Sequence, residues 1–421
     1  MKMKKLLALA AACAVAVSSF AACGGNSDDS ESKTDSTAES VAEESSAVEK
    51  IPETDEEWHQ AMLNKAMVSY GNTYMMQDVI KRAQAGEEVT IAYLGGSITE
   101  GISAGPEDCY AKLTYNHFAE TFGTGDNVKY HNAGLSGTPS KLGILRLDRD
   151  VLAEDPDVVF IEFAVNDGSE PDYQNAYESI VQTLLQRNIA VVLLFSVTAE
   201  DYSAQDYMKE IGYAYNLPMI SYCDALRYLF ENDRMTWQDF SDDQSHPNVE
   251  GHKLVAEMVN YYFDTVMDVE PTGEYIMPMD YVYSPREINA HMVENDGITP
   301  VSLGSWTEGS EIASFTKGWS HKSDAGNEPI VFEMDAKFVY MIYHEAKQGN
   351  FGKLHVKITV DGEVYDECDY EVLSPNGWGN AQVQNIAMEP TNTKYRVEIS
   401  MAEGDEETFA EILGFGYTAD E

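Results

Sequence analysis

The sequence has 421 residues, 43% of them hydrophobic, so the chain can bury a sizeable core and, at roughly 100 to 200 residues per domain, form two domains. Asp and Glu number 72 against 27 Lys and Arg, which gives a formal net charge of -45. This acidity makes nucleic acid a poor candidate partner, whereas uncharged or weakly cationic polymers fit it.

The first 22 residues have the layout of an export signal. A basic start precedes a run of Leu, Ala and Val that ends in small residues, so residues 1–22 predict a signal peptide rather than a structural transmembrane helix. The run ends in FAAC, which resembles a bacterial lipobox and would make Cys23 the lipidated mature N-terminus. Ordinary cleavage after Ala22 stays open, because the first lipobox position, usually Leu, is Phe20. The expected location is extracytoplasmic, anchored to the bacterial cell membrane by that lipid alone, or secreted if the lipobox is not used.

Residues 23–55 are polar and acidic. They hold few large apolar residues, and so burial cannot offset the entropy of ordering them. The composition predicts a flexible tether.

Residues 56–270 alternate helix-like amphipathic stretches with short apolar runs, the pattern of β-α-β units around a parallel sheet. The expected strands are VTIAYLG, VKYHNAG, PDVVFIEFAVND, IAVVLLFSV and PMISYC. The expected helices cover residues 56–85, 110–121, 141–153, 173–186, 205–215 and 250–263. A five-stranded parallel sheet covered by helices predicts a flavodoxin-like three-layer α/β/α domain.

In residues 271–421 the pattern changes, and apolar and polar residues alternate at period two, as in KLHVKITVDGEVYDECDY and KYRVEISM. The VDG triplet indicates a hairpin. We therefore expect an all-β sandwich, jelly-roll-like, entered through the connector EPTGEYIMPMDYVYSPREINAHM.

Four polar blocks stand out. GGSIT, NAGLSGT and AVND each lie at the end of an expected strand, and DFSDDQSHPN precedes the last expected helix. Ligands bind at the carboxyl ends of the strands in open α/β sheets, so these blocks mark the expected site. In order and spacing over residues 88–265, they resemble the SGNH (GDSL-like) hydrolase/esterase family. With the β-rich region that follows, the chain resembles two-domain bacterial carbohydrate esterases.

The resemblance implies that Ser97 is the nucleophile and that His246 and Asp243 complete a triad. A serine hydroxyl needs a base within hydrogen-bond reach, and a carboxylate can orient the imidazole. The resemblance also implies that Ser97, Gly134 and Asn166 donate hydrogen bonds to the oxyanion. Loss of one such donor typically costs about 2.7 to 4 kcal/mol of transition-state stabilisation.

Each residue also has an ordinary structural interpretation. Alone, Ser97 could be a helix N-cap and Asn166 a turn residue. His252 is expected to be structural or to support the site from behind. Asp242 would replace Asp243 as the partner of the histidine if Asp243 points away.

The sequence departs from the family pattern in two blocks. The aspartate usual after the first glycine of the serine block is Gly96, and Ala164 stands where a glycine is common in the third block. Neither position belongs to the triad, but with these two departures the sequence does not determine how rigid the two loops are. Thr99 excludes the G-x-S-x-G elbow of α/β-hydrolases.

Two weaker sets of candidates could contact substrate. Arg146 and the nearby Arg149 could touch substrate or brace the NAGLSGT loop, although ion pairs on a helix surface are favoured. Trp306, Trp319 and Trp378 could form a sugar-stacking platform or pack in a core or hinge.

No cofactor or metal site is predicted. The histidines of the β-rich region lack ligand spacing, and no D-x-D-x-D-G loop is present. The cysteines beyond the N-terminal region form no zinc spacing and no disulfide framework, and are expected to be small buried residues: Cys109, Cys223 and Cys368.

These observations predict a surface-tethered serine esterase that removes small acyl groups, above all O-acetyl, from a polysaccharide through an acyl-enzyme. Hydrolysis of acyl groups on peptidoglycan, exopolysaccharide, lysophospholipid or a thioester is an alternative. A glycan-binding lipoprotein with a vestigial esterase site is another. The sequence indicates neither the sugar nor the oligomeric state.

Overall fold

The computed structural model describes residues 51–375 and 377–420. The predicted signal peptide, Cys23 and nearly all of the predicted tether lie outside the described residues. Within the described part of the chain, no helix combines the length and apolar character needed to cross a membrane.

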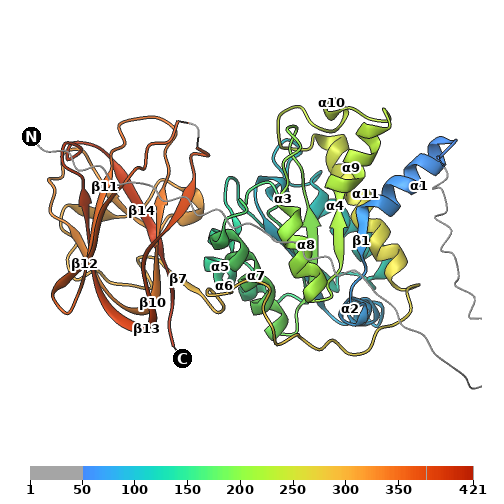
Figure 1. Cartoon of the computed structure of the whole chain (residues 1–421), viewed down its shortest axis with the longest axis horizontal. Helices are drawn as coiled ribbons and strands as arrows, with labels where there is room; N and C mark the ends of the chain where they lie inside the picture. Colours follow the sequence, from blue (N-terminus) through green and yellow to red (C-terminus); the bar gives the residue numbers. More distant parts are fainter. Residues whose placement is uncertain (1–50, 376, 421) are drawn as a thin grey trace, which may run out of the picture. The chain divides into compact units, whose positions relative to one another are not determined.

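A parallel sheet forms the centre of the first domain (Figure 1). Its strands, in the order β1-β6-β5-β4-β2-β3, are β1 (Met67–Ser69), β2 (Val89–Gly95), β3 (Val128–Gly134), β4 (Val158–Glu162), β5 (Ala190–Phe195) and β6 (Met219–Ser221). The five predicted strands pair in parallel, which confirms the sheet expected from the sequence. The additional strand, β1, pairs antiparallel with β6 at the edge.

Helices cover both faces of this sheet and complete the predicted three layers. One face carries α1 (Asp55–Ala66), α2 (Tyr74–Gln84), α4 (Tyr110–Phe122), α9 (Tyr222–Glu231) and α11 (Val249–Val266). The other carries α5 (Ser140–Leu145), α6 (Leu147–Asp150), α7 (Pro171–Gln186) and α8 (Gln205–Ala214). The short helices α3 (Ser97–Glu100) and α10 (Trp237–Phe240) and the 3-10 turn η1 (Leu152–Glu154) lie in connections.

Two of the expected helices are interrupted. The predicted helix 56–85 breaks at β1 and at Gly71, which has φ +53° and lies so close to the segment before β6 that a Cβ would be 2.2 Å from the Leu217 carbonyl carbon. Only glycine tolerates that approach and that backbone conformation. The predicted helix 141–153 is divided into α5, α6 and η1, because Arg146 leaves the helical conformation at φ -89° and ψ 2°.

The second domain is all-β and antiparallel, as predicted. Hydrogen bonds join its strands in one path, β12-β11-β13-β10-β14-β9-β8, with β7 on β14, rather than in two separate sheets. The strands are β7 (His291–Val293), β8 (Trp306–Glu308), β9 (Trp319–His321), β10 (Ile330–His344), β11 (Leu354–Val360), β12 (Glu363–Tyr370), β13 (Ala381–Met401) and β14 (Ala410–Thr418), with a 3-10 turn η2 (Ala313–Phe315). The VDG hairpin joins β11 to β12, with positive φ at Asp361 and Gly362.

Both domains contribute to one buried apolar cluster. Leu145 of α5 and Tyr177 of α7 belong to it together with Tyr340 of β10 and Val383 of β13. The connector is also anchored, because the carboxylate of the buried Glu178 accepts the backbone N–H groups of residues 282 and 283. Removing the second domain would therefore expose part of the core of the first.

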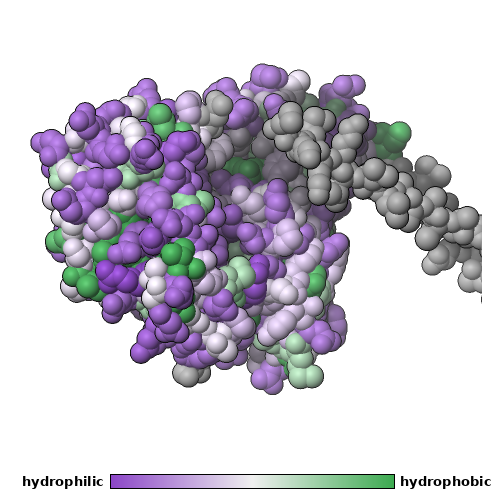
Figure 2. All heavy atoms as spheres, turned by 60° about the vertical axis from the view of Figure 1, so that its left-hand side comes forward, coloured by the Kyte–Doolittle hydropathy of each residue, from purple (hydrophilic) through white to green (hydrophobic). Residues whose placement is uncertain are grey.

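Hydrophilic residues cover most of the face shown in Figure 2, as the charge of the chain leads one to expect. Of the three cysteines in the described residues, all free, Cys109 and Cys223 are buried as predicted. The prediction is wrong for Cys368, which is exposed because β12 is an edge strand with little packed against it.

Candidate active site

The loops after β2, β3 and β4 meet the segment before α11 at the carboxyl edge of the parallel sheet, where open α/β sheets bind ligands. After β2, the chain turns at Gly96 into α3, and Ser97 is the first residue of that helix. The N-cap is therefore Gly96, which corrects the alternative interpretation of Ser97 as the cap.

Ser97, His246 and Asp243 form a continuous hydrogen-bonded chain. Ser97 Oγ lies 2.8 Å from His246 Nε2, and His246 Nδ1 lies 2.7 Å from Asp243 Oδ2. The second oxygen, Asp243 Oδ1, accepts the backbone N–H groups of Ser245 and His246 at 2.7 and 2.8 Å. The structure thus brings together three predicted residues, two of them 149 positions apart, and Asp243 rather than Asp242 faces the imidazole.

The Asp243 carboxylate is stabilised as an anion. Partial burial raises its pKa, but the backbone N–H groups of His246 and Ser245 and the ion pair with His246 together outweigh burial and lower the pKa below its usual value. An ionised carboxylate at this position can hold the Nδ1–H tautomer and stabilise an imidazolium.

Asn166 faces the same cavity as Ser97 and His246. Its Oδ1 is buried against Gly96, where a Cβ atom would lie only 2.3 Å from that oxygen. A side chain at position 96 would therefore require the Asn166 side chain to shift. No described residue accepts a hydrogen bond from the Asn166 side-chain amide, so the amide is available to a ligand.

Gly134 does not offer the N–H group predicted from the sequence. That N–H donates to Asn132 Oδ1 at 2.8 Å, and Gly134 packs so closely on α3 that a Cβ would be 2.1 Å from Glu100 N. The glycine serves close packing at the end of β3 and not oxyanion binding.

Gly137, three residues later in the same loop, is a glycine that the sequence analysis did not single out. It has φ +70°, it lies against Trp378 of the second domain, and no described residue accepts its N–H. Trp378 in turn lines the cavity that holds Ser97. The sequence carried a signal, because NAGLSGT contains a second glycine beyond the strand.

The three tryptophan candidates have different environments. Trp378 is 49% exposed and lines the cavity of about 220 Å³ beside Ser97 and His246. Trp306 and Trp319 are 3% and 0% exposed and belong to the core of the β domain. The prediction of a sugar platform is wrong for these two, because their rings pack inside the domain.

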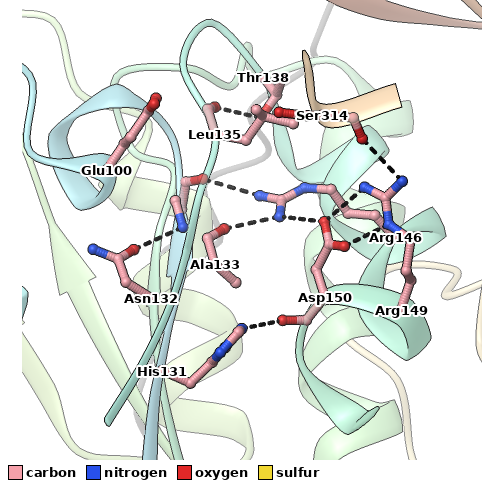
Figure 3. Close-up of polar contacts among 12 residues, drawn as sticks. Glu100, His131, Asn132, Ala133, Leu135, Thr138, Arg146, Arg149, Asp150 and Ser314 are labelled. Atoms are coloured by element: carbon pink, nitrogen blue, oxygen red, sulfur yellow. Dashed lines mark hydrogen bonds and ion pairs between the residues drawn. The ribbon is translucent and has the colours of Figure 1, made fainter. Parts of the chain in front are cut away.

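Arg146 is not a substrate contact either. Its guanidinium is buried and donates to the carbonyl oxygens of Ala133 and Gly95, while it forms an ion pair with Asp150 (Figure 3). The neighbouring Arg149 also pairs with Asp150. For Arg146 the geometry fits bracing of the loop, and for Arg149 it fits the ion pairs favoured from the sequence, with Asp150 and Glu294.

Two buried titratable groups lie behind the site. His252 accepts the Tyr110 N–H at 3.1 Å, and burial lowers the pKa of His252 to about 4, so this ring is neutral and structural. The Glu162 carboxyl, at the end of β4, accepts from Ser196 and from Thr99 of α3. Sequence analysis did not single out Glu162, which lies inside an apolar run.

Glu162 makes the stability of the fold depend on pH. Burial raises its pKa from 4.5 to about 7, against the lowering effect of Ser196 and Thr99. Between these values the folded state holds a proton that the unfolded state has lost, so the free energy of unfolding falls as pH rises through this window. We expect Glu162→Gln to reduce that fall, measured as melting temperature against pH by calorimetry.

Asp167, whose pKa burial also raises to about 7, acts in the same direction and remains in the Glu162→Gln variant. The slope should therefore become shallower without disappearing. A slope in Glu162→Gln equal to that of the unaltered protein would contradict proton uptake by Glu162.

Comparisons with known proteins agree with this geometry. Residues 93–254 match the GDSL-like Lipase/Acylhydrolase family. Two crystal structures of a two-domain esterase active on acetylated mannans, one co-crystallized with mannopentaose, are 26% identical to this chain, with TM-scores of 0.74 and 0.75. They cover 85% of this chain, which covers 98% and 99% of theirs. No curated protein sequence matches the chain significantly. The match to the GDSL-like Lipase/Acylhydrolase family thus falls within the α/β domain, which an all-β domain follows.

Proposed function

We propose that this protein is a serine esterase that removes acetyl groups from a polysaccharide through an acyl-enzyme. The observation that carries the proposal is the hydrogen-bonded chain from Ser97 Oγ through His246 to Asp243, with Ser97 and His246 lining an open cavity. This arrangement supplies a nucleophile, a base and an orienting carboxylate within hydrogen-bond reach.

In the first half of the reaction, Ser97 Oγ attacks the acetyl carbonyl carbon while His246 Nε2 takes the hydroxyl proton. The tetrahedral intermediate collapses when His246 returns that proton to the departing sugar oxygen, leaving acetyl-Ser97. A water molecule then attacks the acetyl carbonyl carbon while His246 takes its proton. The bond to Ser97 Oγ breaks as His246 returns that proton to the serine oxygen, and acetate leaves. Asp243 stabilises the imidazolium in both halves.

Three donors converge on the position of the oxyanion in this proposal. Ser97 N–H is at the first turn of α3 and has no acceptor within that helix. Gly137 N–H takes the place first assigned to Gly134, and the Asn166 amide completes the set. Preorganised donors of this kind stabilise charge that develops only in the transition state.

A saccharide substrate is supported by two observations. The similar two-domain esterase is active on acetylated mannans. Trp378, contributed by the β domain, presents a half-exposed ring to the cavity beside Ser97, and an aromatic face suits the apolar face of a sugar ring. The second domain would therefore contribute to substrate binding within the catalytic cavity itself.

We test this proposal by measuring acetate release from acetylated mannan, acetylated xylan, acetylated peptidoglycan and a chromogenic acetyl ester. We expect release from acetylated plant-type polysaccharide, and we expect Trp378→Ala to raise KM for the polysaccharide about tenfold while leaving the small ester unchanged. A point variant is preferred to removal of the β domain, because the two domains share a buried cluster.

The control is Tyr281→Ala, which removes an exposed aromatic ring from the connector. Equal losses on polysaccharide and small ester in Trp378→Ala would assign Trp378 a structural role. No acetate from any substrate, by folded protein, would overturn the proposed activity in favour of another acyl group or of glycan binding alone.

The proposed location rests on the sequence. A signal peptide over residues 1–22 and lipid attachment at Cys23 would hold the enzyme at the outer side of the cell membrane, where polysaccharide is accessible. The tether would let the catalytic unit reach polymer beyond the membrane surface.

A further inference from the structure

Arg146 is a buried cation beside two strand ends that carry the site. Its side chain is 1% exposed, and its Nη2 and Nη1 donate to the carbonyl oxygens of Gly95 at 3.1 Å and Ala133 at 2.8 Å (Figure 3). Gly95 ends β2 two residues before Ser97, and Ala133 lies near the end of β3, just before the loop that carries Gly137. One guanidinium therefore joins the strand that delivers the nucleophile to the strand that delivers the Gly137 loop.

We propose that Arg146 is a positioning residue for ester hydrolysis, which fixes the distance between the N–H groups of Ser97 and Gly137 by holding the carbonyl groups of Gly95 and Ala133. The proposal rests on the function proposed above. Arg146 contacts no substrate in this role and acts only through the backbone of the two strands.

The chemistry of the side chain favours this role over simple packing. Burying a charge is costly, and an aliphatic residue would fill the same space without that cost. Asp150 offsets the charge, with Oδ2 3.1 Å from Arg146 Nη1, and Asp150 is itself held by Arg149. Arg146 Nε is buried with no partner among the described residues. What arginine adds is a planar fork of donors that spans two acceptors on neighbouring strands.

Other ties also hold this loop. β2 and β3 pair in register up to Gly95 and Gly134, the Leu135 N–H donates to the Gly95 carbonyl at 3.0 Å, and further contacts run to α3. Asn132 accepts the Gly134 N–H through Oδ1 and donates through Nδ2 to the Thr99 carbonyl at 2.7 Å. The Glu100 carboxylate accepts the backbone N–H of Ser136 at 2.7 Å and also its hydroxyl. These contacts remain when the arginine is replaced, so the loop should keep its fold and its pairing with β2, while the position of the residues beyond Leu135, Gly137 among them, becomes less well defined.

The test replaces Arg146 with methionine and measures hydrolysis of a small chromogenic acetyl ester. We expect kcat to fall about a hundredfold, the effect typical of a displacement of about 1 Å in a catalytic group, while KM stays within twofold. Arg146→Lys keeps the charge but cannot span both carbonyls, so its kcat should be intermediate. Arg187→Met is the matched control, because that exposed guanidinium also donates to a backbone carbonyl, of Thr183, and its loss should not change kcat.

Melting temperature separates positioning from stability. A merely structural Arg146 would lower the melting temperature of the methionine variant and leave kcat per folded molecule unchanged, which would overturn the proposal. If Arg146→Met does not fold, the kcat of Arg146→Lys tests the proposal instead. A kcat within twofold of that of the unaltered protein would overturn the proposal.

A second readout does not depend on turnover. Amide hydrogen exchange of residues 133–138 should be faster in Arg146→Lys than in the unaltered protein, because one tie to β2 is lost. Unchanged exchange overturns the positioning role. Absence of Ser97-dependent turnover in the unaltered protein refutes the proposed function instead, so the two failures are distinguishable.

Discussion

Replacing Ser97 with alanine should lower kcat for acetate release by about 10⁴- to 10⁶-fold while the protein keeps its fold. The substitution removes only the hydroxyl that His246 holds at 2.8 Å, and the N–H groups and side chains around it remain. The residual rate would come from the oxyanion donors and from substrate binding. Acetate release from the best polysaccharide and from the small ester measures the effect, and circular dichroism checks the fold.

Ser320→Ala is a matched control for this experiment. Ser320 is 8% exposed, as Ser97 is, but its hydroxyl donates to a backbone carbonyl in the β domain. The control should keep kcat within twofold of the unaltered protein. A loss of less than about tenfold in Ser97→Ala would remove Ser97 from the role of nucleophile.

Replacing His246 with alanine should be more damaging than replacing Asp243 with asparagine. Among the described residues, the first change removes the only group within hydrogen-bond distance that can take the Ser97 proton, and kcat should fall as far as in Ser97→Ala. The second keeps a side-chain oxygen for the N–H groups of Ser245 and His246, so the loop should stay in place. It removes the charge that stabilises the imidazolium, and we expect a loss of about 10² to 10⁴ in kcat.

Asp242→Asn is the control for this pair, since Asp242 is exposed and Asp243 faces the imidazole. Asp242→Asn should leave kcat unchanged. A larger loss in Asp242→Asn than in Asp243→Asn would reassign the carboxylate partner of His246. An Asp243→Asn enzyme slower than His246→Ala would contradict the roles of His246 as base and Asp243 as its orienting partner.

The β-α-β alternation, the five parallel strands and the following all-β region were predictable because they depend on local periodicity. Strand β2 reads as an apolar run followed by glycines, and the hairpin between β11 and β12 follows from Asp361 and Gly362, whose backbone adopts positive φ. The members of the Ser97–His246–Asp243 chain were predictable for a different reason, since each lies in a block that resembles the SGNH (GDSL-like) family pattern. Their mutual distances were not.

The oxyanion loop shows where the sequence was insufficient. Gly134 and Gly137 stand in one short block. Although Gly137 follows the expected strand, its position does not by itself show which glycine packs and which presents an N–H group. The difference arises because Gly134 is still inside β3 and packs on the backbone of α3, whereas Gly137 lies beyond the strand, against Trp378.

The sequence by itself determined the class of each domain, the order of the polar blocks and the residue types available for chemistry, because these properties are encoded within a few neighbouring positions. Only the tertiary structure decided that Trp306 and Trp319 are core residues while Trp378 lines the cavity, and that Arg146 lies under two strand ends. Burial and partnership depend on groups distant along the chain, as with Ser97 and His246, and periodicity within a segment carries no information about what another segment places beside it.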